Sequence, residues 1–166
     1  GIVSLRYFNP IGAHESALIG ERFAENPIHI LPYITKTAIG NKKKLTIFGN
    51  DYKTKDGTCV RDYMHVSDLA DIHLMILKKI FKEKNSLVIN CGYGKGYSVQ
   101  QIVNIFKNIK KNVSVEYLKR RPGDIAQVYS NTKKFKKFLK WKPKYNNIKK
   151  IILSAIRWEK KLNKKN

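Results

Sequence analysis

Two arginines stand where their side chains could hold a phosphate group. Arg61 lies in the segment VRDY and Arg121 in the segment RRPGD, each beside a turn. A guanidinium presents its N–H donors as a planar fork that matches a diphosphate, whereas a lysine offers only a point charge. We therefore predict that the two arginines bind a diphosphate. The alternative is a structural ion pair with Asp62 or Asp124.

A second chemical pattern is Tyr-x-x-x-Lys, in which the lysine lowers the pKa of the tyrosine so that it can act as a base. It occurs at Tyr129 with Lys133 and at Tyr145 with Lys149. Nine tyrosines and 28 lysines among 166 residues produce about 1.5 such pairs by chance, so two pairs carry no information. Asn131, a predicted helix cap, also separates the first pair, so its members would not share a helix face. We assign no catalytic residue within this sequence.

The glycine-rich segment 92–96, GYGKG, joins a predicted strand to a predicted helix. A dinucleotide-binding fingerprint requires G-x-G-x-x-G, and here the third glycine comes one position early. The spacing favours a tight turn with close packing between the strand and the helix.

The cysteines and histidines lack the spacing of a disulfide framework or a metal site. Cys59 and Cys91 are the only two cysteines, and the four histidines contain no His-x-x-x-His pair. His65 and His73 lie near acidic residues, as histidines on surface helices often do. We expect free thiols, a reducing compartment and no bound metal.

Strands and helices alternate along the sequence, which indicates an α/β fold. The predicted strands are 2–8, 44–48, 87–90 and 113–118. The predicted helices cover 28–39, a segment from Ser67 to Ile80, a segment that begins at Ser98, a lysine-rich segment after Asn131 and a segment that begins at Asn147. The first strand ends in a loop at Asn9-Pro10, and open α/β sheets place ligands at that end of a strand. The polar segment 49–57 is predicted as a hairpin or a long binding loop.

Start and stop signals support these helices. Ser98 and Gln101 form a capping box, Ser67 is predicted as an N-cap, and Gly40 ends the first helix. The buried stripes of the first two helices are predicted as Ile28, Leu31, Ile34, Thr35 and Ala38, and as Leu69, Ile72, Ile76, Leu77 and Ile80.

The charge balance is strongly basic, with 34 Lys and Arg against 12 Asp and Glu, a net charge of +22. Such a field attracts polyanions. However, 28 of the basic residues are lysines and the chain also has 14 asparagines, a bias that codon usage produces on any solvated surface. Aromatic residues do not alternate with the lysines, even in the basic segment 133–166, so a nucleic-acid-binding module is kept only as an alternative. No apolar stretch approaches the roughly 20 residues that span a bilayer, so we expect no membrane segment.

Six sequence blocks, taken in order, resemble one enzyme family. They are LRYFNPIGAH at 5–14, FGNDY at 48–52, DGT at 56–58, VRDYMHV at 60–66, DLA at 68–70 and RRPGD at 120–124. The chain is similar over essentially its whole length to UDP-glucose 4-epimerases, which belong to the extended short-chain dehydrogenase/reductase class. The resemblance implies an α/β fold that is the C-terminal, substrate-binding half of such an enzyme. Residues 1–10 would be the terminal strand of its Rossmann-type nucleotide-binding fold, and residues 11–166 the substrate-binding domain.

The resemblance also implies an activity. Such an enzyme uses tightly bound NAD to oxidise the sugar C4 hydroxyl to a 4-keto intermediate and then returns hydride to the opposite face. The glycine fingerprint, the catalytic Ser and the Tyr-x-x-x-Lys pair of the family should precede Gly1, so we expect this chain to be inactive alone. The implied substrates are UDP-glucose and UDP-galactose, with UDP-N-acetylhexosamines left open, and the implied full-length enzyme is a cytoplasmic homodimer. Half of a different nucleotide-sugar enzyme of this class, a decarboxylase or a dehydratase, is a further alternative.

Finally, the resemblance implies site residues. It places a nicotinamide contact at Phe8 and substrate contacts at Asn9, His29, Ile30, Leu45, Thr46, Ile47, Phe48, Arg61, Arg121, Asp124 and Val128. Residues 45–48 would form the uracil slot, and the two arginines would clamp the diphosphate, which His29 and Ile30 would also touch. Asn9 would bind the phosphates or the sugar, Asp124 would accept a hydrogen bond from a ribose hydroxyl, and Val128 would face the sugar C2 substituent.

Overall fold

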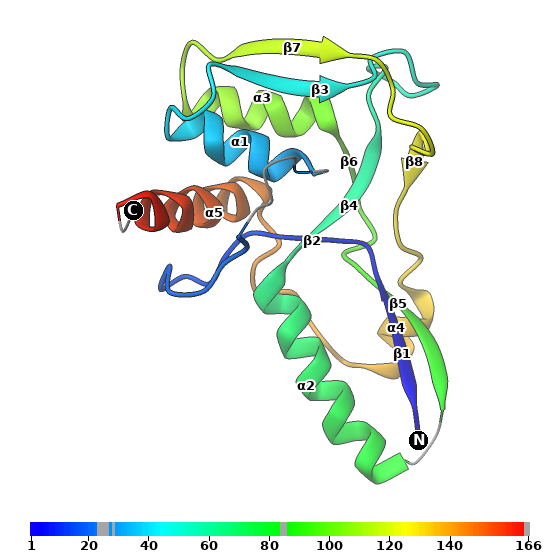
Figure 1. Cartoon of the computed structure of the whole chain (residues 1–166). Helices are drawn as coiled ribbons and strands as arrows, with labels where there is room; N and C mark the ends of the chain where they lie inside the picture. The colour runs from blue at the N-terminus through cyan, green and yellow to red at the C-terminus, as the bar shows by residue number, and fades with distance from the viewer. Residues whose placement is uncertain (23–26, 28, 84–85, 165–166) are drawn as a thin grey trace.

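A computed structural model describes residues 1–22, 27, 29–83 and 86–164 of the chain. Figure 1 shows the elements. The strands are β1 (Val3–Tyr7), β2 (Asn9–Ile11), β3 (Lys44–Phe48), β4 (Val60–His65), β5 (Leu87–Cys91), β6 (Gly96–Ser98), β7 (Ser114–Leu118) and β8 (Gln127–Val128), and the helices are α1 (Ile30–Ala38), α2 (Val66–Glu83), α3 (Val99–Ile109), α4 (Lys133–Phe138) and α5 (Ile148–Asn163). Every strand and helix predicted from the sequence is present, and the α/β class is confirmed.

Three small sheets organise the chain. β1 pairs with β5 and β3 pairs with β7, both in parallel. In the third sheet β4 is central, with β2 and β8 parallel to it and β6 antiparallel. In Figure 1, β4 runs from the end of the molecule that holds β3 and β7 to the end that holds α2 and β1. The third sheet therefore links the two ends.

Each end has its own apolar core. One core lies among α1, α3, α5 and β3, and its fully buried side chains include Ile34, Leu45, Phe106 and Ile152. The other lies among α2, α4 and β5, around Met64, Ile72, Ile89 and Phe135. Full burial of one such side chain stabilises the fold by roughly 1.5–3 kcal/mol, so these two clusters hold the framework that positions the loops between them.

The first strand does not end in a loop at Asn9-Pro10, as the sequence suggested. The backbone changes direction at Phe8 and continues as β2, which pairs Pro10 with Met64 of β4. Among the described strands, β2 pairs only with β4, so the missing N–H of Pro10 breaks no ladder on its other side. The expected loop is therefore a second strand.

The polar segment 49–59 is a loop and not a hairpin, because β3 pairs with β7 and not with β4. Gly49 and Gly57 both have positive φ, at +79° and +77°. A Cβ on Gly57 would lie 2.1 Å from the Asn50 carbonyl oxygen, so only glycine permits this close turn.

The start of α2 also differs from the prediction. The helix begins at Val66, directly after β4, so Ser67 lies inside it and is not the N-cap. The His65 Nδ1 accepts the hydrogen bond from the Ser67 N–H at 3.0 Å, which is the role expected of a capping oxygen. Leu77, predicted as buried, is 51% exposed, whereas Ile72 and Ile76 are buried as expected.

The later helices follow their local signals closely. Ser98 and Gln101 form the predicted capping box, and the Asn147 side chain accepts from the Lys150 N–H. Asn131 accepts from the Lys133 N–H at 3.1 Å, although Thr132 occupies the N-cap position of α4. In the first helix Pro32 lies in the first turn and Gly40 follows the end with φ +91°, while Ile28 lies outside the described residues.

No helix in the described ranges combines the length and the apolar composition that crossing a membrane requires.

Candidate functional site

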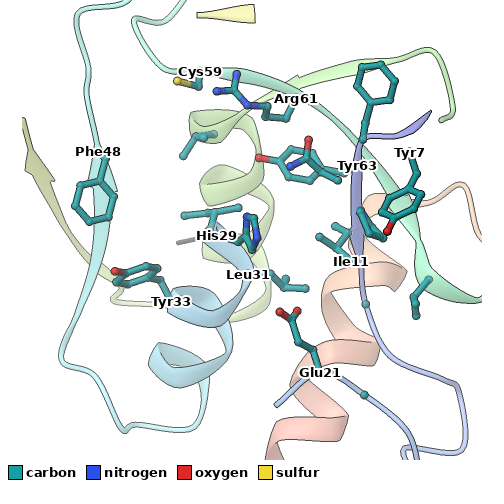
Figure 2. A pocket seen from close by; sticks show the side chains of 18 of the residues that line it. Tyr7, Ile11, Glu21, His29, Leu31, Tyr33, Phe48, Cys59, Arg61 and Tyr63 are labelled. Atoms are coloured by element: carbon teal, nitrogen blue, oxygen red, sulfur yellow. The ribbon is translucent and has the colours of Figure 1, made fainter. Parts of the chain in front are cut away.

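A cavity of about 1010 Å³ opens where β1 and β2, the start of α1, β3, β4 and the turn at 121–124 meet. It is shown from close by in Figure 2. Ten of the twelve residues that the sequence assigned to a ligand line it: Phe8, Asn9, His29, Ile30, Thr46, Ile47, Phe48, Arg61, Arg121 and Asp124. They come from five separate stretches of sequence, which the fold brings to one hollow large enough for a nucleotide-sized ligand.

The charged wall of this cavity is built by two arginines and one carboxylate. Arg121 Nη2 and Nε lie 2.8 and 2.9 Å from Asp124 Oδ2, and Arg61 Nη2 lies 3.6 Å from Asp124 Oδ1. The side chains of Arg61 and Asp124 are only 16% and 18% exposed, so water screens this cluster weakly. Arg61 Nη1 also donates to the Val60 carbonyl at 2.9 Å, which fixes the guanidinium on β4.

An aromatic wall adjoins the arginines. The rings of Tyr33 and Phe48 pack edge to face with centroids 5.9 Å apart, and Figure 2 shows them together on one side of the cavity. The Arg121 guanidinium lies 5.1 Å from the centre of the Phe48 ring. A flat apolar face next to two cations suits a ligand that joins an aromatic base to an anionic group.

Leu45 and Val128 lie outside this cavity. Leu45 has no exposed surface and belongs to the core beneath β3. Ile47 shares this buried face, because every second residue of a strand points the same way, but only Ile47 also lines the cavity. Val128 pairs with Arg61 in the register of β8 and β4 and lines an adjacent hollow of about 390 Å³. Arg61, Asp124, Phe8 and Asn9 line both spaces, so the two hollows share a wall.

The proposed alternative pairing of Arg61 with Asp62 is wrong. Asp62 points to the other side of β4, has no exposed surface and accepts hydrogen bonds from the Tyr93, Gly94 and Ser130 N–H groups and from the Ser130 hydroxyl. Neighbouring residues on a strand face opposite sides, which separates the two side chains. The other alternative, an ion pair between Arg121 and Asp124, is present, so the arginines are held by Asp124 and still line the cavity.

Residues 92–95 form a bend between β5 and β6, so the predicted turn leads into a second strand and not directly into the helix. Gly94 has φ +72°, and a Cβ on Gly92 would lie 2.4 Å from both the Asp62 carboxylate and the Ser130 hydroxyl. Glycine at position 92 is what lets the turn approach the buried carboxylate.

Neither Tyr-x-x-x-Lys pair lines the cavity. Tyr129 is 52% exposed, and the Tyr145 ring stacks on His65 at 4.4 Å. His65 Nδ1 accepts from the Ser67 N–H, so its proton is on Nε2, which lies 3.4 Å from the Ser154 hydroxyl. That hydroxyl donates a hydrogen bond to the Ile151 carbonyl and accepts one from the Ala13 N–H. It therefore holds the backbone at Ala13 against α5 at the edge of the cavity.

The acidic residues near His65 and His73, Asp68 and Asp71, make contacts within the fold. Asp68 accepts from the Tyr93 hydroxyl and from two backbone N–H groups at 144 and 145, and Asp71 pairs with Lys144 at 2.7 Å. Within the part of the chain that the structure describes, no three His, Cys, Asp or Glu side chains are grouped so that they could hold a metal ion. Cys59 and Cys91 are buried free thiols.

Sequence reasoning missed several lining residues. Tyr7 and Tyr63 stand in the blocks LRYFN and VRDY beside predicted site residues, so the same motifs could have indicated them. Glu21 carried no such signal. It lines the cavity near His29 in Figure 2, and burial raises the pKa of its carboxyl while the charge of His29 lowers it.

Comparison with known proteins agrees with this geometry. The sequence profile of the family described as GDP-mannose 4,6 dehydratase matches residues 1–152. A UDP-glucose 4-epimerase of Oryza sativa subsp. japonica is 46% identical over 148 residues, which are 87% of this chain and 42% of that protein. The chain spans about half the length of the curated relatives it matches.

Solved structures of UDP-glucose 4-epimerases have the same fold. The enzyme from Stenotrophomonas maltophila, solved with NAD and formylated UDP-arabinopyranose, superimposes with a TM-score of 0.93 and 36% identity over 99% of this chain and 49% of its own. The enzyme from Bifidobacterium longum, in complex with NAD+ and UDP, superimposes with a TM-score of 0.88 and 42% identity. That match covers 96% of this chain and 48% of the chain of that enzyme. The resemblance stated from the sequence blocks is thereby confirmed, as is the assignment to part of an extended short-chain dehydrogenase/reductase fold.

Proposed function

This chain belongs to the GDP-mannose 4,6 dehydratase family, and from that premise we propose that it is the UDP-sugar-binding half of a UDP-hexose 4-epimerase. The observation that carries the proposal is the pair Arg61 and Arg121 on one wall of a cavity whose adjoining wall is Phe48. Curated relatives at 42–47% identity are named as UDP-glucose 4-epimerases, which supports this choice over a decarboxylase or a dehydratase.

The ligand's parts match different walls. The uracil ring would lie against β3 at Thr46 and Phe48, above the buried Ile47, with backbone groups reading the base edge. Arg61 and Arg121 would bind the diphosphate, because charge-assisted hydrogen bonds in a poorly hydrated cleft are the strong kind. His29, Ile30 and Asn9 line the same space and would contact the diphosphate or the sugar.

The sugar would lie toward the smaller hollow, which Val128 lines. Asn9 lines both hollows, so its side chain can reach the sugar or the phosphate next to it. Asp124 would accept from a ribose hydroxyl. Leu45 would support this site only from the core below.

The nicotinamide cofactor has a matching surface on this chain. Phe8 lines both hollows at the point where the backbone turns from β1 to β2, and it offers an apolar ring that could pack on a planar group. NAD, when bound, supplies a reversible hydride acceptor. Phe8 would orient that group, and Asn9 would hold the sugar beside it, so that oxidation at C4 gives a 4-keto sugar. Residues 1–10 would complete the nucleotide-binding fold, residues 11–166 would bind the sugar nucleotide, and the full-length enzyme would be a cytoplasmic homodimer.

The test is UDP binding by isothermal titration calorimetry on the purified chain and on Arg61→Ala. We expect saturable binding that weakens by about 2–3 kcal/mol in the variant, because a charged partner is lost from a desolvated pair. Arg120→Ala is the matched control, since Arg120 pairs with Asp51 at the surface, outside the cavity. The alternative of a nucleic-acid-binding module predicts steeply salt-dependent oligonucleotide binding with no UDP binding.

A further inference from the structure

The carboxylate of Asp124 occupies the space between the two guanidiniums of the cavity. Both of its oxygens are used, Oδ2 by Arg121 and Oδ1 by Arg61. Its side chain is 18% exposed, so it faces the arginines more than it faces water. An anionic ligand that comes to Arg61 and Arg121 therefore meets an anion already in place.

This arrangement occupies the edge of Arg121 that a phosphate would bind. The edge of Arg121 formed by Nε and Nη2 points at a single Asp124 oxygen. That edge is the fork with which arginine binds a phosphate oxygen pair. Two positive charges and one negative charge leave a net charge of one, so a free diphosphate gains much less attraction than two arginines alone would give it.

Asp124 is also placed where it can move without disturbing the core. It ends the turn RRPGD, in which Gly123 has φ +80° and no atom within 4 Å of its Cβ position. In the described residues, its side-chain hydrogen bonds and ion pairs come from the two arginines, and it belongs to neither core cluster. A rotation of this side chain breaks its hydrogen bond and ion pairs with the two arginines and leaves both core clusters in place.

We propose that Asp124 is a specificity-determining residue, an internal counter-anion that excludes free phosphate and pyrophosphate from Arg61 and Arg121 while admitting a nucleoside diphosphate. Pyrophosphate has to displace the carboxylate, and all of its groups belong to one strongly negative ion that repels it. A ribose carries hydroxyl donors, so a nucleotide can displace the carboxylate and still satisfy it with a hydrogen bond. This inference rests on the proposed function, because it takes the diphosphate to lie at the arginines.

The test measures pyrophosphate and UDP binding by calorimetry on the wild-type chain and on Asp124→Asn. Removing the counter-anion should tighten pyrophosphate binding by about five-fold or more, the effect of one charge at contact distance in water-like surroundings. The gain for UDP should be smaller or absent, since the acceptor for its ribose hydroxyl changes from a charged oxygen to a weaker neutral one. Asp124→Ser is the second variant, and the thermal midpoint of each variant reports whether it is folded.

Asp51→Asn is the matched control. It makes the same change in net charge and also frees an arginine, Arg120, but at an exposed ion pair outside the cavity. Both affinities should stay at their wild-type values in this control.

The outcomes separate the two proposals. Unchanged or weaker pyrophosphate binding in both Asp124 variants would mean that the carboxylate holds the arginines in position, and the inference would be overturned even if UDP binds. Tighter pyrophosphate binding without any UDP binding would uphold the counter-anion and overturn the proposed function.

Discussion

The Ser130 hydroxyl donates a 2.5 Å hydrogen bond to the buried carboxylate of Asp62, across 68 residues of sequence. The same carboxylate accepts from the backbone of the turn at 93–94 and from the Ser130 N–H. Three segments thus meet at one buried charge: β4, the turn after β5 and the chain after β8. This junction fixes the pairing of β4 with β8, which sets Arg61 beside Val128 and so aligns the two hollows of the site.

Asp62→Asn should destabilise the fold by about 3 kcal/mol. The amide keeps one acceptor oxygen but turns the other into a donor facing N–H groups, and a buried polar group without its partner is costly. Urea unfolding measures the free-energy change. Asp71→Asn is the control, because Asp71 makes a partly exposed pair with Lys144, and it should change stability little. Equal stability of the two variants would contradict a structural role for the Asp62 junction.

The sequence predicted features that depend on neighbours in the chain. The strand 44–48 has the predicted bounds, and the Ser98 capping box forms because its two partners are three residues apart. It did not predict features that depend on distant partners. Pro10 joins a strand because β4 lies next to it, and His65 takes the capping role from Ser67 because β4 runs directly into α2.

In the candidate site, too, the sequence predicted which residues take part but not how their side chains are directed. Ten of the twelve predicted residues line the cavity. Six of these ten lie in the motif blocks, and the family resemblance implied the other four, which are His29, Ile30, Thr46 and Ile47. The sequence does not show which face of a strand packs on the core. Leu45 faces the core, and Asp62 faces away from Arg61. The counterion of Arg61 is Asp124, 63 residues later, and no local pattern could show that pair.

The stability of the fold should fall as the pH drops below about 6.5. Burial lowers the pKa of His65, and the folded state uses the neutral ring because Nδ1 accepts from the Ser67 N–H. The charges of Asp68 and Glu15 oppose this shift, and that of His14 adds to it. The unfolded chain then binds a proton more readily than the folded chain, so stability is fully present above the unfolded pKa and is lost as the pH falls through it.

Urea unfolding at pH 7.5 and 5.5 measures this loss. His65→Asn should reduce it, because the asparagine oxygen can accept from the same N–H group without titrating. His73→Asn is the control, since that ring makes its hydrogen bond to the Leu69 carbonyl of its own helix and otherwise lies near the Tyr7 ring. An unchanged pH dependence in the His65 variant would exclude His65 as the cause.

The purified chain should bind UDP but should not convert UDP-galactose into UDP-glucose. Both Tyr-x-x-x-Lys pairs lie away from the cavity. Tyr63 does line it, but burial raises the pKa of that phenol, which opposes its use as a base. A coupled assay for UDP-glucose measures turnover, and the Bacillus subtilis UDP-glucose 4-epimerase, 42% identical to this chain, is the positive control. Turnover by the chain alone would mean that another lining residue takes the proton.

The last prediction concerns the width of the proposed sugar site. Val128 lines the smaller hollow, and its isopropyl group is much smaller than an aromatic side chain. Tyr129 does not fill the space, because its ring lies over Gly96, 3.3 Å from the Cβ position of that glycine. A larger pocket removes a steric penalty without needing a new contact, so the chain should bind UDP-glucose and UDP-N-acetylglucosamine with similar affinity.

Val128→Tyr should therefore act on one ligand more than on the other. A phenol ring in a hollow of about 390 Å³ should weaken binding of the N-acetylated nucleotide by about ten-fold or more and change UDP-glucose binding by less than about three-fold. Val128→Ala, which widens the hollow, is the control and should leave the ratio of the two affinities unchanged. Calorimetric titration of both nucleotides into the three proteins gives these ratios. If the wild-type chain already rejects the N-acetylated nucleotide, or if the tyrosine variant binds both equally, the size of residue 128 does not set the width of the site.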